Sequence, residues 1–431
     1  MKKKYRIILY TSIFLLCVVA SIILVVKKSN SVYEEESKPK VVKHKSMLSM
    51  NLEQTAGSGD YKTVTQSKWP TEGYKFNAEL SRCENGSTLS WDDTKKAVIV
   101  SGNLSDKCYV YFDIYQPTLA EYIKSQYTGT QGENNIYYHD SDLANGAGDN
   151  SYRYAGASGS VNNFVCFGTT ESPCPTDNLY RIIGVFGENY HGVTGKQLVK
   201  LIKYDYMTTD ELGTDGDYSQ TYKEWGMDST YKGTYGDGER IGVYYWNYKA
   251  TGSATNTWST SLLNKTNLNT NFINNIGTTW ANKIATVTWK VGGNTWANIG
   301  TKTSSVAYTN EITNPVTTNT TDNATTYSAK IGLMYVSDYG FAASPDAWTL
   351  TMSSYNNTTA TNNNWMYMGL YEWTISRTAD FSDGAFGVYG GGFVDLYNVG
   401  DNLGVRASFN LESSVSYVSG SGSMSDPIVI N

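Results

Sequence analysis

Residues 179–186 read LYRIIGVF, and residues 197–205 read QLVKLIKYD. Both runs are dominated by branched and aromatic side chains, which suit the pleated surface of a β-sheet. The segment between them, 187–195, is mostly polar and contains three glycines, as the connection of a hairpin does. The two runs therefore predict a pair of adjacent strands in a β-rich fold.

Further strand-like runs lie on both sides of this pair. They are KAVIVS at 96–101, CYVYFD at 108–113, and shorter runs at 330–337, 365–376, 405–411 and 427–430. Apolar residues recur at helical spacing in 117–127, and helices are also expected around 258–276 and 279–286. The mixture predicts an α+β, β-rich chain.

Four cysteines form two pairs that are close in sequence, Cys83 with Cys108 and Cys166 with Cys174. The first pair brackets a hairpin-like unit, and the second brackets a short loop. We expect the disulfides Cys83–Cys108 and Cys166–Cys174, formed in an oxidising compartment. Buried free thiols are the alternative, while the spacing does not fit a zinc site.

Residues 7–26 form an uncharged run between Arg6 and Lys27. As a helix, this run spans the roughly 30 Å hydrocarbon layer of a bilayer, which predicts a transmembrane helix. A cleaved signal peptide is the alternative, although its apolar stretch is usually shorter. Basic residues flank the run on both sides, but long domains are translocated largely regardless of charge. With oxidised cysteines, this predicts a single-pass cell-membrane protein whose C-terminal part is extracytoplasmic.

Changes in composition suggest the domain boundaries. Residues 1–28 are expected to be the membrane anchor, and 29–68, which contain the run Glu34-Glu35-Glu36, a flexible stalk. Residues 69–116 predict a small disulfide-linked β domain. Residues 117–431 predict a large α+β module with long Asn- and Thr-rich loops.

The charge distribution argues against a nucleic-acid partner. The whole chain has a net charge of -6, but its first 28 residues carry six basic residues and no acid, so the remainder is at -12. An acidic surface repels phosphate backbones.

Several segments in their order along the chain resemble a known family. These are LYRIIGVF; a block containing Trp258, Ser261, Leu263, Leu268, Asn269 and Phe272; GLMYVS at 332–337; YEWTISR at 371–377; and GVRASFNL at 404–411. The set resembles an uncharacterised bacterial surface-protein family whose C-terminal domain is similar to the C-type-lectin-like fold of formylglycine-generating-enzyme relatives. The resemblance covers roughly 117–431 and implies a C-type-lectin-like module with a variable, ligand-facing loop.

The chain departs from two chemistries of that superfamily. Its oxidases use a pair of C-terminal cysteines, whereas no cysteine follows Cys174 here. Its calcium-dependent lectins carry Glu-Pro-Asn or Gln-Pro-Asp and Trp-Asn-Asp triplets, and the chain contains none of these. The fold alone therefore does not imply an activity.

Acidic clusters offer only weak metal candidates. Asp205, Asp210, Asp215 and Asp217 are close in sequence, and oxygen-rich loops can hold calcium, but their spacing does not match an EF-hand. His139 lies near Asp140, Asp142 and Asp149, a combination that is common in surface loops. We expect no cofactor and no metal site, with calcium possible at the first cluster.

Residues 378–401 are the best candidate for a binding segment. Tyrosine and phenylalanine rings, which stack on sugars and on protein surfaces, alternate there with Asp and Asn around Gly390-Gly391-Gly392. The residues expected to contact a ligand are Asp383, Tyr389, Phe393, Asp395, Tyr397 and Asn398. The alternative is that Tyr389, Phe393 and Tyr397 belong to the hydrophobic core.

These observations predict a membrane-anchored, adhesin-like recognition protein that binds a glycan or a protein ligand. No G-x-S-x-G, H-E-x-x-H or Walker motif is present, so no catalytic residues are assigned. An extracytoplasmic glycan or cell-wall hydrolase is one alternative, because paired carboxylates cannot be recognised from sequence. A purely structural envelope component is the other.

Overall fold

A computed structural model describes residues 48–65, 68–70, 73–103, 105–220, 224–226, 240–251, 254–316, 324–356 and 363–431. The chain divides into two compact units between Tyr115 and Gln116. The fold is β-rich, with 33% strand and 21% helix. Within the described residues, no helix is both long and apolar enough to cross a membrane. The predicted span at 7–26 lies outside them.

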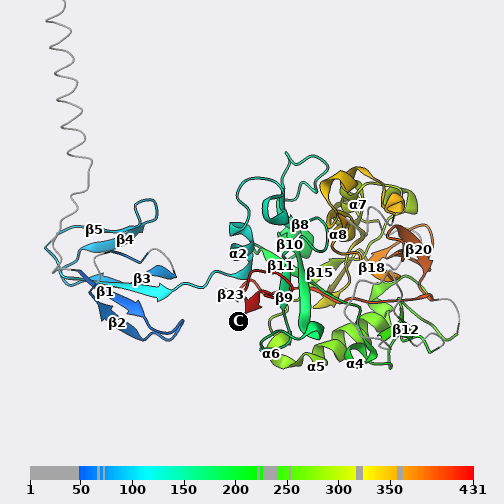
Figure 1. The fold of residues 1–431 in the computed structure, drawn as a ribbon, viewed down its shortest axis with the longest axis horizontal. Coiled ribbons are helices and arrows are strands. Elements are labelled where there is room, and N and C mark those ends of the chain that lie inside the picture. Colours follow the sequence, from blue (N-terminus) through cyan, green and yellow to red (C-terminus); the bar gives the residue numbers. More distant parts are fainter. Residues whose placement is uncertain are drawn as a thin grey trace, which may run out of the picture. The chain divides into compact units, whose positions relative to one another are not determined.

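The smaller unit is built on a four-stranded sheet in the order β2-β1-β6-β3 (Figure 1). Its strands are β1 (Leu48–Glu53), β2 (Tyr61–Val64), β3 (Tyr74–Cys83) and β6 (Cys108–Ile114), and β4 (Thr88–Asp92) pairs with β5 (Ala97–Ser101) as a separate hairpin. β1 runs parallel to β6, whereas the other pairs are antiparallel. Met50, Leu52, Val110 and Phe112 form the buried core.

β1 and β2 correct one expectation. Both strands lie within residues 29–68, which were predicted to be a flexible stalk, so that prediction is wrong from Leu48 onward; residues 29–47 are not described. The reason is tertiary, because β1 buries Met50 and Leu52 against β6, a strand about 60 positions away.

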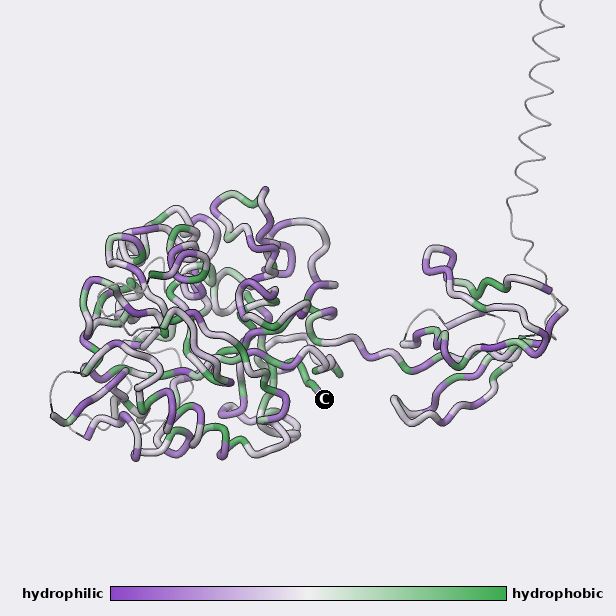
Figure 2. The backbone as a smooth tube through the Cα atoms, turned by 180° about the vertical axis from the view of Figure 1, so that it is seen from behind, coloured by the Kyte–Doolittle hydropathy of each residue, from purple (hydrophilic) through white to green (hydrophobic). Residues whose placement is uncertain are grey.

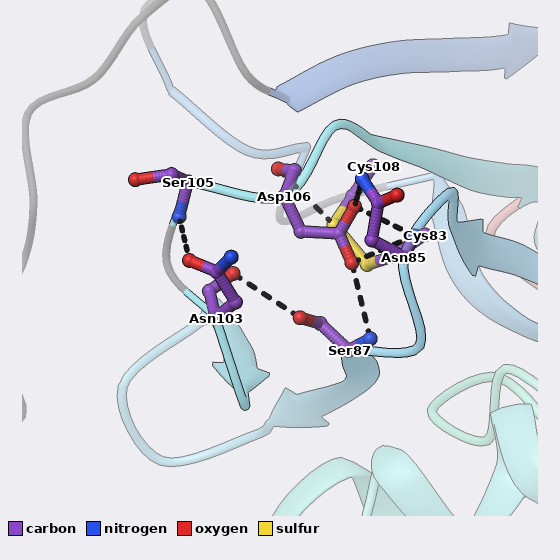
Figure 3. Close-up of a disulfide and its surroundings, with 7 residues drawn as sticks. All are labelled: Cys83, Asn85, Ser87, Asn103, Ser105, Asp106 and Cys108. Atoms are coloured by element: carbon purple, nitrogen blue, oxygen red, sulfur yellow. Dashed lines mark hydrogen bonds between the residues drawn. A yellow bond between two sulfur atoms is a disulfide. The ribbon is translucent and has the colours of Figure 1, made fainter.

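The disulfide Cys83–Cys108 joins the end of β3 to the start of β6 (Figure 3). Beside it, the carboxylate of Asp106 accepts hydrogen bonds from the backbone N–H groups of Asn85 and Ser87. The turn that leads into the β4–β5 hairpin is therefore fixed both covalently and by hydrogen bonds. The second predicted disulfide, Cys166–Cys174, is also present and closes a loop of the larger unit.

The larger unit is centred on a seven-stranded sheet in the order β17-β22-β11-β10-β8-β7, with β9 also paired to β10. The strands are β7 (Ile136–His139), β8 (Ser151–Tyr154), β9 (Phe164–Cys166), β10 (Leu179–Phe186), β11 (Leu198–Lys203), β17 (Ile331–Gly332) and β22 (Ser408–Asn410). The predicted pair of strands is β10 and β11, and every residue of both is buried. Hydrophobic segments run through the middle of this unit (Figure 2).

Short helices and smaller sheets surround the central sheet. The helices are α2 (Leu119–Ser125), α3 (Glu188–His191), α4 (Thr209–Leu212), α5 (Ile273–Asn275), α6 (Gly277–Ala281), α7 (Ser304–Tyr308) and α8 (Val336–Phe341), with π-helical turns at Leu263–Phe272 and Thr309–Thr313. Two-stranded sheets pair β12 (Glu224–Gly226) with β13 (Arg240–Gly242), β14 (Tyr244–Tyr245) with β21 (Asn402–Leu403), β15 (Val287–Lys290) with β16 (Thr326–Ala329), and β23 (Tyr417–Ser419) with β24 (Val429–Ile430). A three-stranded sheet of β18 (Glu372–Arg377), β19 (Gly384–Val388) and β20 (Val394–Asn398) completes the unit.

The strand predicted at 330–337 is only partly correct. It ends at Gly332, and helix α8 begins at Val336. The carboxylate of Glu311 accepts hydrogen bonds from the N–H groups of Val336 and Ser337, so the start of α8 is capped by a residue that is distant in sequence. The strand predicted at 365–376 likewise forms only from Glu372.

Candidate recognition site

The candidate site lies on the three-stranded sheet. β18 carries the Glu-Trp-Thr motif, and β19 and β20 form a hairpin in which Val388 pairs with Val394 and Gly384 pairs with Asn398. The hairpin therefore has a closed end at residues 389–393 and an open end at Asp383 and Asn398. At about 3.3 Å per residue, these ends are roughly 15 Å apart.

Two buried tyrosines fix the closed end through hydrogen bonds to its backbone carbonyls. The hydroxyl of Tyr339 donates to the carbonyl of Gly392 at 2.6 Å, and the hydroxyl of Tyr367 donates to the carbonyl of Gly390. Within the turn, the N–H of Gly392 donates to the carbonyl of Tyr389 at 2.7 Å. Gly392 has a φ of 98°, which favours glycine at this position. The turn is thus fixed before any ligand arrives.

This turn displays a cluster of three half-buried rings, Tyr371, Tyr389 and Phe393. The rings of Tyr389 and Phe393 stack with centroids 4.5 Å apart and planes at 19°. The ring of Tyr371 meets that of Tyr389 edge-on at 4.6 Å. All three keep part of their surface in solvent, so the cluster offers aromatic surface to a ligand. We call these three residues the aromatic cluster.

Asp395 lies beside the aromatic cluster. Burial raises the pKa of Tyr371 to about 12, with smaller contributions from the Tyr389 hydroxyl and from the charge of Asp395. At neutral pH the Tyr371 phenol is therefore protonated and uncharged. One oxygen of Asp395 accepts from the N–H of Leu396.

Tyr397 is half-buried like Tyr389 and Phe393, and its ring meets that of Tyr371 edge-on at 6.0 Å, but it differs from them in its hydroxyl and in its packing. Its hydroxyl is buried and has no hydrogen-bond partner among the described residues. Its ring meets that of Trp373 edge-on at 6.1 Å and covers Gly387, where an added Cβ would lie 2.9 Å from the Tyr397 ring. Tyr397 therefore supports the sheet, and we do not count it among the ligand-contacting residues.

Asp383 and Asn398 lie at the open end of the hairpin. The side-chain amide of Asn398 donates to Asp383 at 2.9 Å, and its backbone N–H donates to Asp401 at 2.9 Å. The polar groups at this end of the hairpin are therefore hydrogen-bonded to one another. Of the six predicted residues, the structure thus brings together Tyr389, Phe393 and Asp395, and places Asp383 and Asn398 apart from them.

Sequence reasoning missed Tyr371, Tyr339 and Tyr367. Tyr371 directly precedes the Glu-Trp-Thr motif, and this adjacency was the only available signal. Tyr339 lies in α8 and Tyr367 lies in the segment before β18, so their contact with the turn depends on the tertiary fold.

β18 is anchored by a buried ion pair between the two quoted motifs. Nε and Nη2 of Arg406 donate to the two carboxylate oxygens of Glu372 at 2.8 and 2.9 Å, and Nη2 also donates to the carbonyl of Met366 at 2.6 Å. The indole of Trp373 donates to the carbonyl of Tyr244. The Glu-Trp-Thr and Gly-Val-Arg segments therefore form the rigid base of the site.

Three of the four aspartates considered for calcium have hydrogen-bond partners within the protein. Asp217 is buried, and its Oδ2 accepts from the N–H groups of Tyr248, Leu262 and Leu263, so hydrogen-bond donors surround this oxygen. Asp215 accepts from Asn271, and Asp205 accepts from the N–H of Tyr206. Across the described ranges, no three His, Cys, Asp or Glu side chains are grouped as metal ligands would be.

His139 is part of the core. Burial, followed by the charge of Arg153, holds its pKa well below the usual range, and its ring packs against Phe341 and Trp348. Asp149 is paired with Arg153 at 2.8 Å, and Asp140 caps a turn by accepting from Asp142 and Leu143. The structure does not combine these groups into an acid–base set.

Comparison with known proteins adds no assignment to this geometry, because no family model, curated protein or solved structure matches the chain.

Proposed function

We propose that the protein is a cell-surface recognition protein that binds a glycan through the aromatic cluster. The observation that carries the proposal is the pre-formed turn, in which Tyr389 and Phe393 are held half-exposed by the hydroxyls of Tyr339 and Tyr367. Rings fixed in advance lose little entropy on binding. Sugar rings present apolar C–H faces that stack on such aromatic surfaces, and Asp395 adds a hydrogen-bond acceptor.

The proposed location rests on two features. The uncharged run at 7–26 has the length of a membrane anchor. The two disulfides are typical of an extracytoplasmic compartment. We therefore propose a single-pass membrane protein with its two units outside, and a C-type-lectin-like relationship for the larger unit, supported by the quoted motifs around Glu372 and Arg406.

The test is a glycan array probed with residues 48–431. A protein that began at residue 69, the predicted start of the small β domain, would lack β1 and β2. We expect selective binding that persists in chelator, since the proposed contacts are ring stacking and a hydrogen bond to Asp395. Replacing both Tyr389 and Phe393 by alanine should lower affinity by at least about tenfold, as loss of an aromatic hot spot does.

Matched controls come from the same hairpin. Asp383→Ala changes the open end and should bind like the unchanged protein. Tyr339→Phe and Tyr367→Phe remove the hydroxyls under the turn and should weaken binding without removing any ligand contact. Selective binding that is unaffected by the Tyr389 and Phe393 replacements would exclude this cluster, and an array without selective binding would favour a protein ligand.

A further inference from the structure

Lys200 is the one lysine of β11 that lies at the centre of the fold with no exposed surface. Its Nζ contacts the carboxylate of Asp338 in α8 at 2.6 Å, and both side chains are completely buried. The two residues are 138 positions apart in the chain. The pair therefore connects the central sheet directly to the helix that supports the candidate site.

The surroundings of this pair are buried and largely aromatic. The rings of Tyr190, Trp289 and Tyr335 lie within 4.4–5.0 Å of Nζ. Burial lowers the pKa of the Lys200 ammonium, and the charge and hydrogen bond of Asp338 act in the opposite direction. The 2.6 Å contact holds the Lys200 nitrogen next to the carboxyl group of Asp338, and proximity of this kind favours a reaction between two groups.

Two donors face the other carboxyl oxygen. The hydroxyl of Tyr190 lies 2.7 Å from Oδ1 and 2.9 Å from Oδ2 of Asp338, and it accepts from Nζ of Lys200 at 2.6 Å. Nη1 of Arg153, which has no hydrogen-bond partner among the described residues, lies 3.6 Å from Oδ1. Oδ2 accepts from the N–H of Tyr335 at 3.0 Å. Negative charge would develop on Oδ1 during attack by an amine. Donors placed in this way stabilise such charge, as in an oxyanion hole.

We propose that Lys200 and Asp338 condense to an intramolecular amide bond that links β11 to α8. A proton passes from Nζ to Oδ2 across the 2.6 Å contact, which leaves a neutral amine and a carboxylic acid. Nζ then forms a bond to the carboxyl carbon, with Oδ1 held by Tyr190 and Arg153. The bond from that carbon to Oδ2 breaks, and Oδ2 leaves as water with a second proton from the nitrogen.

The energetics of the buried site favour this product. Two charges buried in a low-dielectric core are costly, and condensation removes both together. Arg153 keeps its partner, because it is also paired with Asp149 at 2.8 Å. Because both side chains are completely buried, exclusion of bulk water from the site slows the reverse reaction.

Intact-mass spectrometry of the full chain, with disulfides reduced, tests the proposal. We expect a mass lower than that of the sequence by one water, and a branched peptide joining the segments around Lys200 and Asp338 after proteolysis. The Lys200→Arg variant keeps the positive charge but lacks the reactive amine, and should have the full mass. Recovery of both residues in separate linear peptides from the folded protein would overturn the proposal, whether or not the variant folds.

One other reaction also releases water. Asp-Gly sequences such as Asp383-Gly384 can form a cyclic imide of their own backbone. A loss of water by imide formation would persist in Lys200→Arg and would yield no branched peptide. A mass deficit with those two properties would count against the amide link.

Discussion

The two units of this protein keep their folds by different means. The smaller unit has four fully buried apolar side chains in its sheet and a disulfide at the end of β3. The larger unit has an extensive aromatic core, which also encloses the ion pair Glu372–Arg406. A small core gains most from a covalent link, whereas a large core can contain charges whose partners are fixed in place.

The largest effect is expected from breaking the Glu372–Arg406 pair. Arg406→Met leaves the carboxylate of Glu372 buried without its partner, which should destabilise the larger unit by about 3–5 kcal/mol. Calorimetry should show one transition shifted and the other, from the smaller unit, unchanged. Adding Glu372→Gln should recover part of the loss, and a shift of both transitions would show that the two units unfold together.

Removal of the disulfide in the smaller unit should cost more stability than removal of the disulfide in the larger unit. Cys83 and Cys108 are 25 positions apart and Cys166 and Cys174 are 8 apart, so loop closure alone is worth roughly 3.5 and 2.5 kcal/mol. Serine replacements of the first pair should unfold most of the smaller unit, whereas those of the second should only lower the larger unit's melting temperature. Limited proteolysis of each double variant distinguishes these outcomes. If the smaller unit resisted proteolysis without its disulfide, it would not depend on that bond as expected.

The units should also respond to pH in opposite directions. Burial raises the pKa of Glu311 to about 7, above its ordinary 4.5, so this carboxyl stabilises the larger unit below pH 4.5, and the contribution is lost as pH rises to about 7. From the size of the shift, the loss is roughly 3 kcal/mol.

Asp106 of the smaller unit has the opposite shift. Burial would raise its pKa, but hydrogen bonds from the N–H groups of Ser87 and Asn85 outweigh this and lower it. The stability that it contributes is therefore lost on acidification. Melting temperatures measured at several pH values test both effects. Glu311→Gln should remove the first effect, and Asp106→Asn should remove the second. If melting temperature changed with pH equally in the native protein and its variants, the assignment would be refuted.

The smallest effect on stability is expected at the aromatic cluster. Tyr389 and Phe393 are only half-buried, and of the two Phe393 packs against the core of the larger unit, so the double alanine variant should lose about 1 kcal/mol. Tyr397→Ala, which uncovers Gly387 and Trp373, should lose more. Denaturant titration of both variants provides the comparison, and a larger loss from the double variant would assign its rings to the core.

Local patterns in the sequence predicted the parts of the fold that depend on neighbours along the chain. β10 and β11 follow from dense apolar runs, and each disulfide joins cysteines that are close in sequence. β1 reads LSMNLE, which is weakly strand-like, and forms because β6 is beside it. Helix α8 similarly depends on Glu311 for its start.

The candidate site shows the same limit. Tyr389 and Phe393 were recognisable because they flank a triple glycine in one segment. The burial of the Tyr397 hydroxyl could not be recognised from the sequence, because it depends on how β20 lies over Trp373. The tyrosines that hold the turn come from two other segments, so only the folded chain reveals them.

The parallel pairing of β1 with β6 has a mechanical consequence. A pull transmitted along the chain enters the smaller unit at Leu48 and leaves it after Ile114. Because the strands run in the same direction, these two points lie at opposite ends of the pair, and the force slides one strand along the other. All the hydrogen bonds between them then bear the load together, rather than opening one at a time from one end. The pairing of β1 with β6 therefore gives the smaller unit a shear geometry toward tension applied between Leu48 and Ile114.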